Sequence, residues 1–155
     1  MKNITIIGGG VLGSQIAFQS AYCGFNVTIW LRSKSSIERT KPKLENLRKS
    51  YIEAIELMDK PEGKTLNNWC RGIALKEEFN KEECLKKVEE AFQNIKLELE
   101  MKKSVEDADL VIESMSEDFN AKKELYQKMS PLLPEKTILV TNSSTMLPSR
   151  LAKYT

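Results

Sequence analysis

The first 31 residues of the chain alternate between short apolar runs and a helical stripe of apolar positions. Residues 2–7 form a β-branched run of the kind that is buried on both faces of a parallel sheet. Apolar positions recur at helical spacing over 11–23, and Gly24 stands where a C-terminal helix cap belongs. A second β-branched run covers 26–31. The pattern predicts a strand, a helix and a strand joined as a right-handed parallel βαβ unit.

Long helical patterns replace the strands in the next part of the chain. Apolar residues recur every three or four positions among many charges over 35–58, which predicts a long amphipathic helix. Turn-forming residues follow at 59–63, and a second helical stripe covers 85–95. The stretch around Trp69 has no clear pattern. We therefore expect a helical hairpin inserted after the second strand, over about 35–95.

The rest of the chain returns to strands. Apolar or alternating runs over 96–101, 109–113 and 137–141 predict three further strands, and 121–129 has the pattern of a helix. A length of 155 residues suits one domain with a substantial core. We predict a single α/β domain over 1–155, a Rossmann-type doubly wound, mostly parallel sheet that carries the helical hairpin as an insertion.

Composition and charge exclude several classes of function. A formal net charge of +2, without a clustered basic run, argues against nucleic acid as a partner, and no apolar run is long enough to cross a membrane. The three cysteines, Cys23, Cys70 and Cys84, lack metal-ligand spacing, so we expect reduced thiols, no metal site and a cytoplasmic protein. The chain contains no histidine, the usual general acid or base of dehydrogenases without a catalytic metal or tyrosine.

The motif that carries chemistry is a glycine-rich turn between the first strand and the first helix. Residues 8–13 read Gly-Gly-Gly-Val-Leu-Gly and fit the pattern G-x-G-x-x-G. Gly8 permits a tight turn, Gly10 lets the backbone approach a pyrophosphate, and Gly13 allows the helix to pack closely on the strand. The helix amides at Val11 and Leu12 then favour phosphate charge. This context predicts a nicotinamide dinucleotide site, the alternative being a glycine-rich turn without a ligand.

The end of the second strand bears on which cofactor is used. An Asp or Glu that would bond the adenosine ribose is expected there in an NAD site. The sequence instead has Leu31, followed by Arg32, Ser33 and Lys34. Cations and hydroxyls suit a 2′-phosphate, so we expect binding of NAD(P) with NADP(H) favoured over NAD(H). The alternative is an ordinary solvated basic loop.

Two further turns place polar side chains at the carboxyl edge of the predicted sheet. The strand at 109–113 runs into Ser-Met-Ser-Glu at 114–117, with Lys122 on the following helix, and the strand at 137–141 runs into Asn-Ser-Ser-Thr at 142–145. Ligands bind at this edge of doubly wound sheets. The second cluster has an alternative role, since Ser144 or Thr145 could cap the next helix.

Together these segments resemble the amino-terminal domain of the 3-hydroxyacyl-CoA dehydrogenases over the whole chain. The resemblance rests on four segments in order: Ile7-Gly8-Gly9-Gly10-Val11-Leu12-Gly13, Ala108-Asp109-Leu110-Val111-Ile112-Glu113, Lys122-Lys123-Glu124-Leu125 and Asn142-Ser143-Ser144-Thr145. It implies that Glu117 and Lys122 contact the nicotinamide half of the cofactor. It also implies that Asn142 lies beside the nicotinamide and substrate, and that Ser144 bonds the substrate hydroxyl.

The resemblance further implies an activity and a second domain. Enzymes of this family transfer a hydride between nicotinamide C4 and C3 of a 3-hydroxyacyl substrate in fatty acid metabolism. They use a histidine in a His-Phe-x-Asn-Pro stretch shortly after the asparagine-serine segment, and a carboxyl-terminal domain that holds most substrate and dimer contacts. Neither lies within 1–155, so we expect this chain to lack the catalytic histidine, to be inactive alone, and to come from a homodimeric enzyme that acts on an acyl-CoA-like substrate.

Departures from the family pattern keep other functions open. Leu31 replaces the acidic residue, the Asn-Ser-Ser-Thr segment differs from the usual Asn-Thr-Ser-Ser, and the hairpin is long. Cations on the first hairpin helix could meet the phosphates of coenzyme A or form a solvated face; they are Lys41, Lys43, Arg48 and Lys49. The alternatives are another NADP-dependent reductase of the ketopantoate type, with a catalytic lysine on a later domain, and a non-catalytic nucleotide-binding module.

Overall fold

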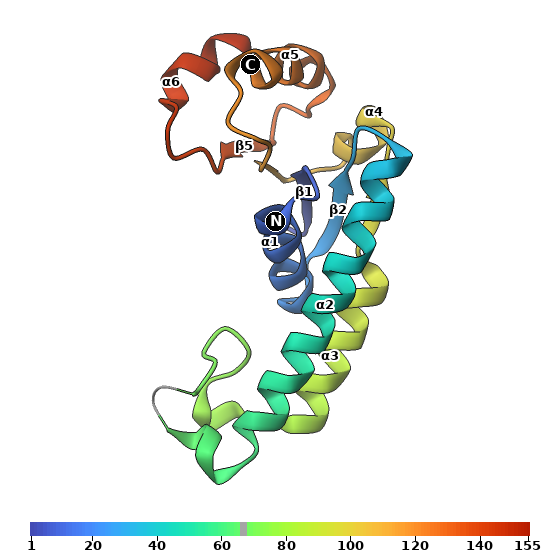
Figure 1. The fold of residues 1–155 in the computed structure, drawn as a ribbon. Helices are drawn as coiled ribbons and strands as arrows, with labels where there is room; N and C mark the ends of the chain where they lie inside the picture. Colours follow the sequence, from blue (N-terminus) through green and yellow to red (C-terminus); the bar gives the residue numbers. More distant parts are fainter. Residues whose placement is uncertain (66–67) are drawn as a thin grey trace.

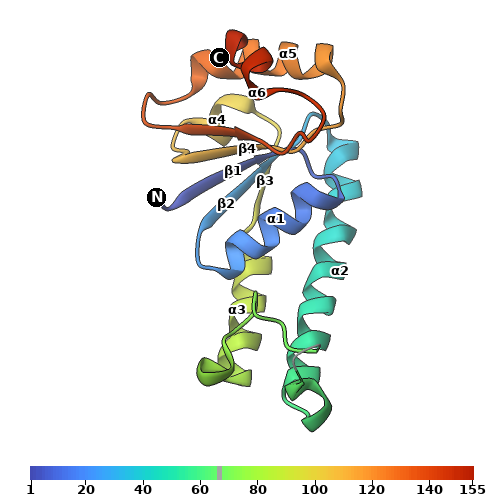
Figure 2. The same cartoon turned by 90° about the vertical axis from the view of Figure 1, so that its left-hand side faces the viewer.

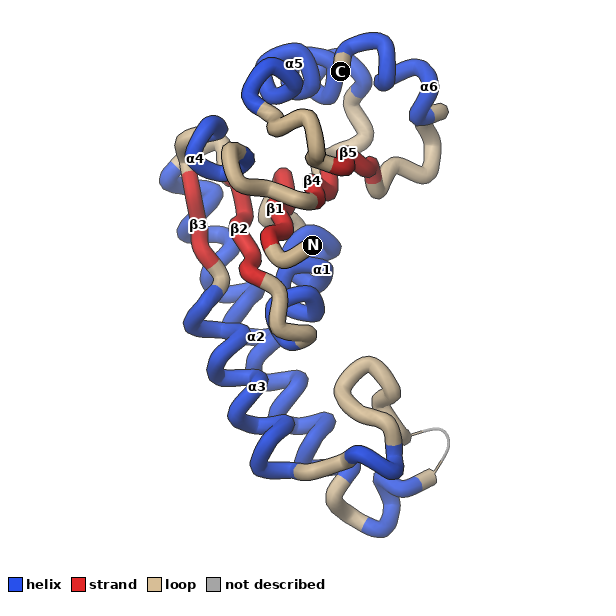
Figure 3. Tube along the Cα trace, turned by 180° about the vertical axis from the view of Figure 1, so that it is seen from behind, coloured by secondary structure: helices blue, strands red, loops and turns tan. Residues whose placement is uncertain are grey.

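The computed structural model describes residues 1–65 and 68–155, which form a five-stranded sheet with helices on both faces (Figures 1 and 3). The strand order is β3-β2-β1-β4-β5, and each pairing is parallel. The strands are β1 (Asn3–Ile7), β2 (Asn26–Trp30), β3 (Lys96–Glu98), β4 (Leu110–Glu113) and β5 (Ile138–Thr141). The chain runs outward from β1 through β2 to β3 and then crosses back to β4, on the other side of β1. Doubly wound folds bind ligands at such a switch point, which here lies between β1 and β4.

The helices divide into two layers, one on each face of the sheet (Figure 2). One layer holds α1 (Val11–Tyr22), α2 (Lys34–Met58) and α3 (Lys81–Asn94). The other holds α4 (Met101–Val105), α5 (Phe119–Met129) and α6 (Pro148–Leu151). Alternation along β1 supplies both cores, because Ile4 and Ile6 pack with the first layer while Ile7 packs with the second. The doubly wound α/β prediction is confirmed.

The βαβ unit forms as the apolar pattern predicted. β1 and β2 pair in parallel with Thr5 opposite Thr28, and α1 returns the chain between them. Gly24 has a φ of +88°, a conformation that glycine adopts without steric cost. Its N–H donates to the Ala21 carbonyl oxygen at 2.9 Å, and the Phe25 N–H donates to that of Ser20 at 3.1 Å. These two bonds are a Schellman cap, which ends α1 and directs the chain into β2.

The inserted hairpin consists of α2 and α3, which run side by side away from the sheet (Figures 1 and 2). The expected insertion of about 35–95 includes residues 66–67, which lie outside the described residues. The stretch around Trp69 is held by side-chain contacts. The Trp69 indole N–H donates to the Ala74 carbonyl oxygen at 2.9 Å, and its ring packs edge-to-face on Phe79, with the ring centroids 5.2 Å apart. Although α2 has 25 residues, none of the helices in the described ranges is both long and apolar enough to cross a membrane.

The prediction of one strand over 96–101 was wrong in its second half. β3 ends at Glu98, and a helix that the pattern did not predict, α4, begins at Met101. The Glu98 carboxylate accepts the backbone N–H groups of Leu99 at 2.7 Å and Glu100 at 2.8 Å. This local bonding turns the chain away from the sheet, which apolar alternation alone does not reveal. The other predicted strands and helices are present with ends shifted by one or two residues, except that α3 begins at Lys81, four residues before the predicted stripe.

Candidate functional site

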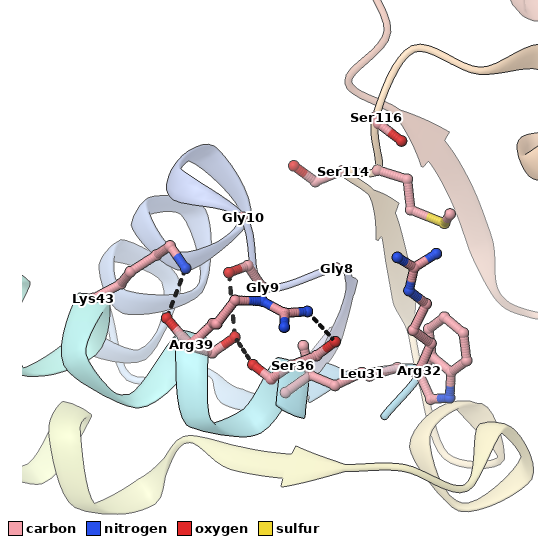
Figure 4. A pocket seen from close by; sticks show the side chains of 13 residues that line it. Gly8, Gly9, Gly10, Leu31, Arg32, Ser36, Arg39, Lys43, Ser114 and Ser116 are labelled. Atoms are coloured by element: carbon pink, nitrogen blue, oxygen red, sulfur yellow. Dashed lines mark hydrogen bonds between the residues drawn. The ribbon is translucent and has the colours of Figure 1, made fainter. Parts of the chain in front are cut away.

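A pocket of about 250 Å³ lies at the carboxyl edge of the sheet, around the glycine-rich turn (Figure 4). Three other segments complete its wall: the end of β2, the first turns of α2 and the turn after β4. The lining residues are Gly8, Gly9, Gly10, Trp30, Leu31, Arg32, Ser36, Arg39, Thr40, Lys43, Ser114, Met115 and Ser116. The pocket thus lies over the point between β1 and β4 where the strand order reverses.

Each glycine of the turn has a different steric environment. Gly8 has a φ of +109°, and a Cβ there would lie 2.8 Å from the Ser114 carbonyl oxygen. A Cβ on Gly13 would overlap the carbonyl oxygen of Gly8, so α1 can approach the turn only with glycine at this position. A Cβ on Gly10 would meet nothing within 4 Å. The backbone at Gly10 therefore faces open space, which leaves room for a ligand at the N-terminus of α1.

Thr40 fastens the first turns of α2 to the glycine turn. Its hydroxyl lies 3.2 Å from the Gly9 carbonyl oxygen and 2.8 Å from that of Ser36. A Cβ on Gly9 would overlap this hydroxyl and press on the Leu31 side chain. The close packing fixes where the side chains of α2 lie relative to the pocket.

One side of the pocket is cationic. Leu31 is buried against the turn, and Arg32 reaches from the end of β2, while Arg39 and Lys43 come from α2 (Figure 4). Arg39 donates to the Ser36 hydroxyl at 3.0 Å, and the Lys43 ammonium donates to the Arg39 carbonyl oxygen at 2.7 Å. Among the described residues that line the pocket there is no carboxylate. This side of the site therefore favours an anion.

Sequence reasoning found only part of this cationic side. It named Arg32, Ser33 and Lys34, of which Arg32 alone is in the described lining. Ser33 instead caps α2, accepting the Ser36 N–H at 3.3 Å, and Lys34 is exposed on the first turn. Arg39 was missed, although its spacing of three residues from Ser36 suits one helix face.

The other half of the carboxyl edge contains a buried ion pair. The Lys122 ammonium lies 2.9 Å from a Glu113 carboxylate oxygen, and the two side chains are 1% and 0% exposed. Glu113 also accepts the Thr141 hydroxyl at 2.6 Å and the Met115 N–H at 2.6 Å. Such pairing is required because an isolated buried charge is very unfavourable. Lys122 was among the site residues expected from the sequence, whereas Glu113 was not given a role there. The signal for Glu113 was a carboxylate at the end of an otherwise apolar strand.

Glu117 connects the buried pair to the turn after β5. Its carboxylate lies 3.7 Å from the Lys122 ammonium and accepts the hydroxyls of Ser143 at 2.6 Å and Thr145 at 2.8 Å. These hydroxyls, followed by the charge of Lys122, hold the pKa of Glu117 below its ordinary value. The site therefore brings together turns that are 28 residues apart in sequence.

The remaining predicted site residues lie in the same turn after β5. Asn142 and Ser144 are both exposed, and the Asn142 N–H donates to the Glu113 carbonyl oxygen at 2.9 Å. The alternative role of Ser144 or Thr145 as a helix cap was wrong. α6 starts at Pro148, and its N-cap residue, Leu147, makes no side-chain cap bond.

The hairpin cations do not form one cluster. Arg48 lies between α2 and α3, where its guanidinium is 2.7 Å from Glu89 and 3.1 Å from Glu45. Glu89 first, and then Glu45, raise the pKa of Arg48 above its ordinary value. Lys41 and Lys49 are exposed. Arg48 thus joins the two hairpin helices, and Lys43 is the hairpin cation that lines the pocket.

Comparison with known proteins gives consistent results. The model of the family "3-hydroxyacyl-CoA dehydrogenase, NAD binding domain" matches residues 3–155. A probable 3-hydroxyacyl-CoA dehydrogenase of Caenorhabditis elegans is 28% identical over 146 residues, covering 94% of this chain and 40% of that protein. The mitochondrial hydroxyacyl-coenzyme A dehydrogenase of Rattus norvegicus is 25% identical over 155 residues, covering 100% and 43%. The chain thus spans less than half the length of these curated relatives.

Solved structures share the fold. A diketoreductase that acts on dicarbonyl compounds has 34% identity and a TM-score of 0.75, and the match covers 99% of this chain and 46% of that one. An (S)-3-hydroxybutyryl-CoA dehydrogenase from Ralstonia eutropha has 20% identity and a TM-score of 0.73, with 100% and 45% covered. The second likeness bears on the fold alone, which is the one observed here.

Proposed function

Since this chain belongs to the 3-hydroxyacyl-CoA dehydrogenase family, as its NAD-binding domain, we propose that the whole protein moves a hydride between nicotinamide C4 and C3 of a 3-hydroxyacyl substrate. The curated relatives that match over nearly all of the chain are dehydrogenases of hydroxyacyl-CoA compounds. When bound, the nicotinamide supplies or accepts the hydride. The protein's part is to bind the cofactor, orient it and hold the substrate oxygen.

The observation that carries the proposal is the open glycine turn beneath the pocket. Gly10 faces open space at the N-terminus of α1, while Gly8 and Gly13 are fixed by the packing of the turn. The first N–H groups of a helix have no acceptors within the helix and attract phosphate. A pyrophosphate at Gly10 would place one half of a dinucleotide beside β2 and the other half beyond β4.

We further propose that this site prefers NADP(H). The residue after β2 is the buried, uncharged Leu31, so no carboxylate there would repel a 2′-phosphate. Arg32, Arg39 and Lys43 line the same pocket and provide cations of the kind that bind phosphate oxygens. In this proposal Lys43 binds the cofactor phosphate, and not the phosphates of coenzyme A.

Beyond β4, on the other side of the glycine turn from Arg32, the exposed turn after β5 would hold the substrate and the nicotinamide. Ser144 and Asn142 lie at the carboxyl edge next to the segment that bonds Glu117. A hydroxyl and an amide there can hydrogen-bond a substrate oxygen and the nicotinamide. The general base would be a histidine outside residues 1–155, in keeping with the family resemblance. An acyl-CoA substrate and a homodimer belong to the same proposal.

A second candidate substrate class is a dicarbonyl compound that is not bound to coenzyme A. It is favoured by the 34% identity to a diketoreductase, since the two curated dehydrogenases are 28% and 25% identical. Steady-state rates of the whole protein with acetoacetyl-CoA and with a dicarbonyl compound that lacks coenzyme A would separate the two classes. Turnover of neither, with intact cofactor binding, would favour a binding module.

The cofactor proposal is tested by calorimetric titration of the chain with NADPH and with NADH at one ionic strength. We expect both to bind and NADPH to bind more tightly. Arg32→Ala should weaken NADPH about tenfold or more by removing a charge-assisted hydrogen bond, and should leave NADH unchanged. Equal losses for both nucleotides would contradict the 2′-phosphate role, and no binding of either would contradict the dinucleotide site.

A further inference from the structure

The buried carboxylate of Glu113 neutralises Lys122 but does not line the pocket. We propose that Glu113 is a positioning residue for the nicotinamide half of the cofactor, acting through Lys122 on Glu117. The proposal rests on the proposed dinucleotide site. It does not depend on the choice between NADP(H) and NAD(H), because the residues involved lie on the other side of the glycine turn from the cationic pocket.

The position of Glu113 in the sheet makes it a fixed point. It is the last residue of β4, opposite Ile7 of β1 and Thr141 of β5, so it lies at the carboxyl edge with a paired strand on each side. Its carboxylate oxygens are held by the Met115 N–H and the Thr141 hydroxyl, each at 2.6 Å. Because β5 and the turn after β4 both bond this carboxylate, it cannot move without breaking these contacts.

Lys122 transmits this position and does not itself line the pocket. Its side chain is 1% exposed, and its ammonium lies 2.9 Å from Glu113 and 3.7 Å from Glu117. Tyr126, on the same helix, is also buried, and its burial followed by the charge of Glu113 raises its pKa to about 12. In such a setting the ammonium needs Glu113 as its counter-charge.

Glu117 is the exposed member of the group. Its side chain is 40% exposed, and its carboxylate is held by Lys122 together with the hydroxyls of Ser143 and Thr145. A carboxylate at this edge accepts hydrogen bonds from ribose hydroxyls or from the nicotinamide amide. Glu117 thus joins the turn after β4 to the turn after β5. Glu113, through Lys122, sets where that junction lies.

The test compares a whole cofactor with its adenosine half. NADPH and 2′,5′-ADP are titrated into the wild-type chain and into Glu113→Gln, a variant of nearly the same shape without the charge. We expect the affinity for NADPH to fall about tenfold, because Glu117 is no longer held in place, and that for 2′,5′-ADP to stay unchanged. Equal losses for both ligands, or no loss for either, would overturn the proposal.

A double-mutant cycle separates positioning from simple stabilisation. The single variant Lys122→Met is titrated in the same way, as is the double variant that carries both Glu113→Gln and Lys122→Met. The double variant also replaces the buried ion pair by two neutral side chains that can still pack. If Glu113 acts through Lys122, adding Glu113→Gln to Lys122→Met causes no further loss of NADPH affinity. Additive losses would overturn the proposal.

A matched control breaks an ion pair at the opposite edge of the sheet. Lys136 lies 2.8 Å from Asp109, next to the start of β4, and is 63% exposed. Lys136→Gln should leave the affinities for both ligands unchanged. If the wild-type chain binds NADH but not NADPH, the same variants are titrated with NADH and ADP. Failure of the wild-type chain to bind any of these ligands would refute the dinucleotide site itself, which is a different result from selective loss in the variants.

Discussion

The two sides of the glycine turn hold their charges in opposite ways. On the β2 side, Arg32 and Arg39 are exposed side chains around an open pocket, attached to a strand end and to one face of α2. On the β4 side, Glu113 and Lys122 are fully buried and bonded across β4, β5 and α5. The first arrangement is free to meet a ligand, whereas the second is part of the core.

The difference shows that one site can combine charges that are removed at little cost in stability with charges that are costly to remove. An exposed cation costs little to add or remove, because water solvates it in either case. A buried pair is costly to break, since the remaining partner would be left charged in an apolar environment. We therefore expect the β2 side to decide which dinucleotide binds, and the β4 side to decide how firmly the reactive half is held.

The largest contrast is expected within the glycine turn itself. Gly13→Ala places a Cβ onto the Gly8 carbonyl oxygen and should lower the free energy of unfolding by about 4 kcal/mol or more. Gly10→Val points into open space and should leave that free energy unchanged while abolishing binding of both nucleotides. Urea unfolding followed by circular dichroism, with titration of each folded variant, measures the two effects. Retained binding in Gly10→Val would show that the ligand lies elsewhere.

The second contrast concerns the stability of the two sides. Lys122→Met leaves Glu113 buried without its counter-charge and should destabilise the fold by about 3 kcal/mol. Arg39→Ala removes an exposed side chain and should not change the free energy of unfolding. The same urea experiment measures both. Comparable losses would mean that the cationic side is part of the core after all.

The third contrast is in cofactor discrimination. Arg39→Ala should weaken NADPH about tenfold by loss of one phosphate contact, with NADH unaffected. Arg48→Ala is the matched control, because Arg48 lies on the same helix but pairs with Glu89 and Glu45. It should leave the ratio of the two affinities unchanged. A change in that ratio for Arg48→Ala alone would place the 2′-phosphate further along α2.

The smallest effect is expected from the exposed ion pair at the amino edge of the sheet. Lys136, and then the N–H groups of Lys2 and Asn3, hold the pKa of Asp109 below its ordinary value of 3.8. A lowered carboxyl pKa contributes stability that is present above pH 3.8 and is lost as the pH falls towards the lowered value. Asp109→Asn should therefore be less stable than wild type at neutral pH, with the difference shrinking below pH 3.8. Thermal unfolding across this range measures it, and a constant difference would exclude titration of Asp109 as the cause.

Much of the fold could be predicted from the sequence, because its signals are local. The β-branched runs, the helical stripe before Gly24 and the glycine pattern at 8–13 each lie within a few residues. Such patterns fix the secondary structure and the βαβ unit with little help from the rest of the chain. The strand over 96–101 failed because the bonds of Glu98 to its own turn end β3, and hydrophobic alternation does not report side-chain-to-backbone bonding.

The candidate site also has a part that local sequence signals predict and a part that depends on the fold. By itself, the sequence determined the glycine turn, the basic residue after β2 and the polar turns after β4 and β5, since each is a contiguous segment. Only the tertiary structure decided that Arg39 shares a pocket with Arg32, and that Glu113 pairs with Lys122 beneath Glu117. Those partnerships depend on how α2 packs on the turn and on the register that puts Glu113 opposite Thr141. Packing and register arise from the whole core, so no local pattern encodes them.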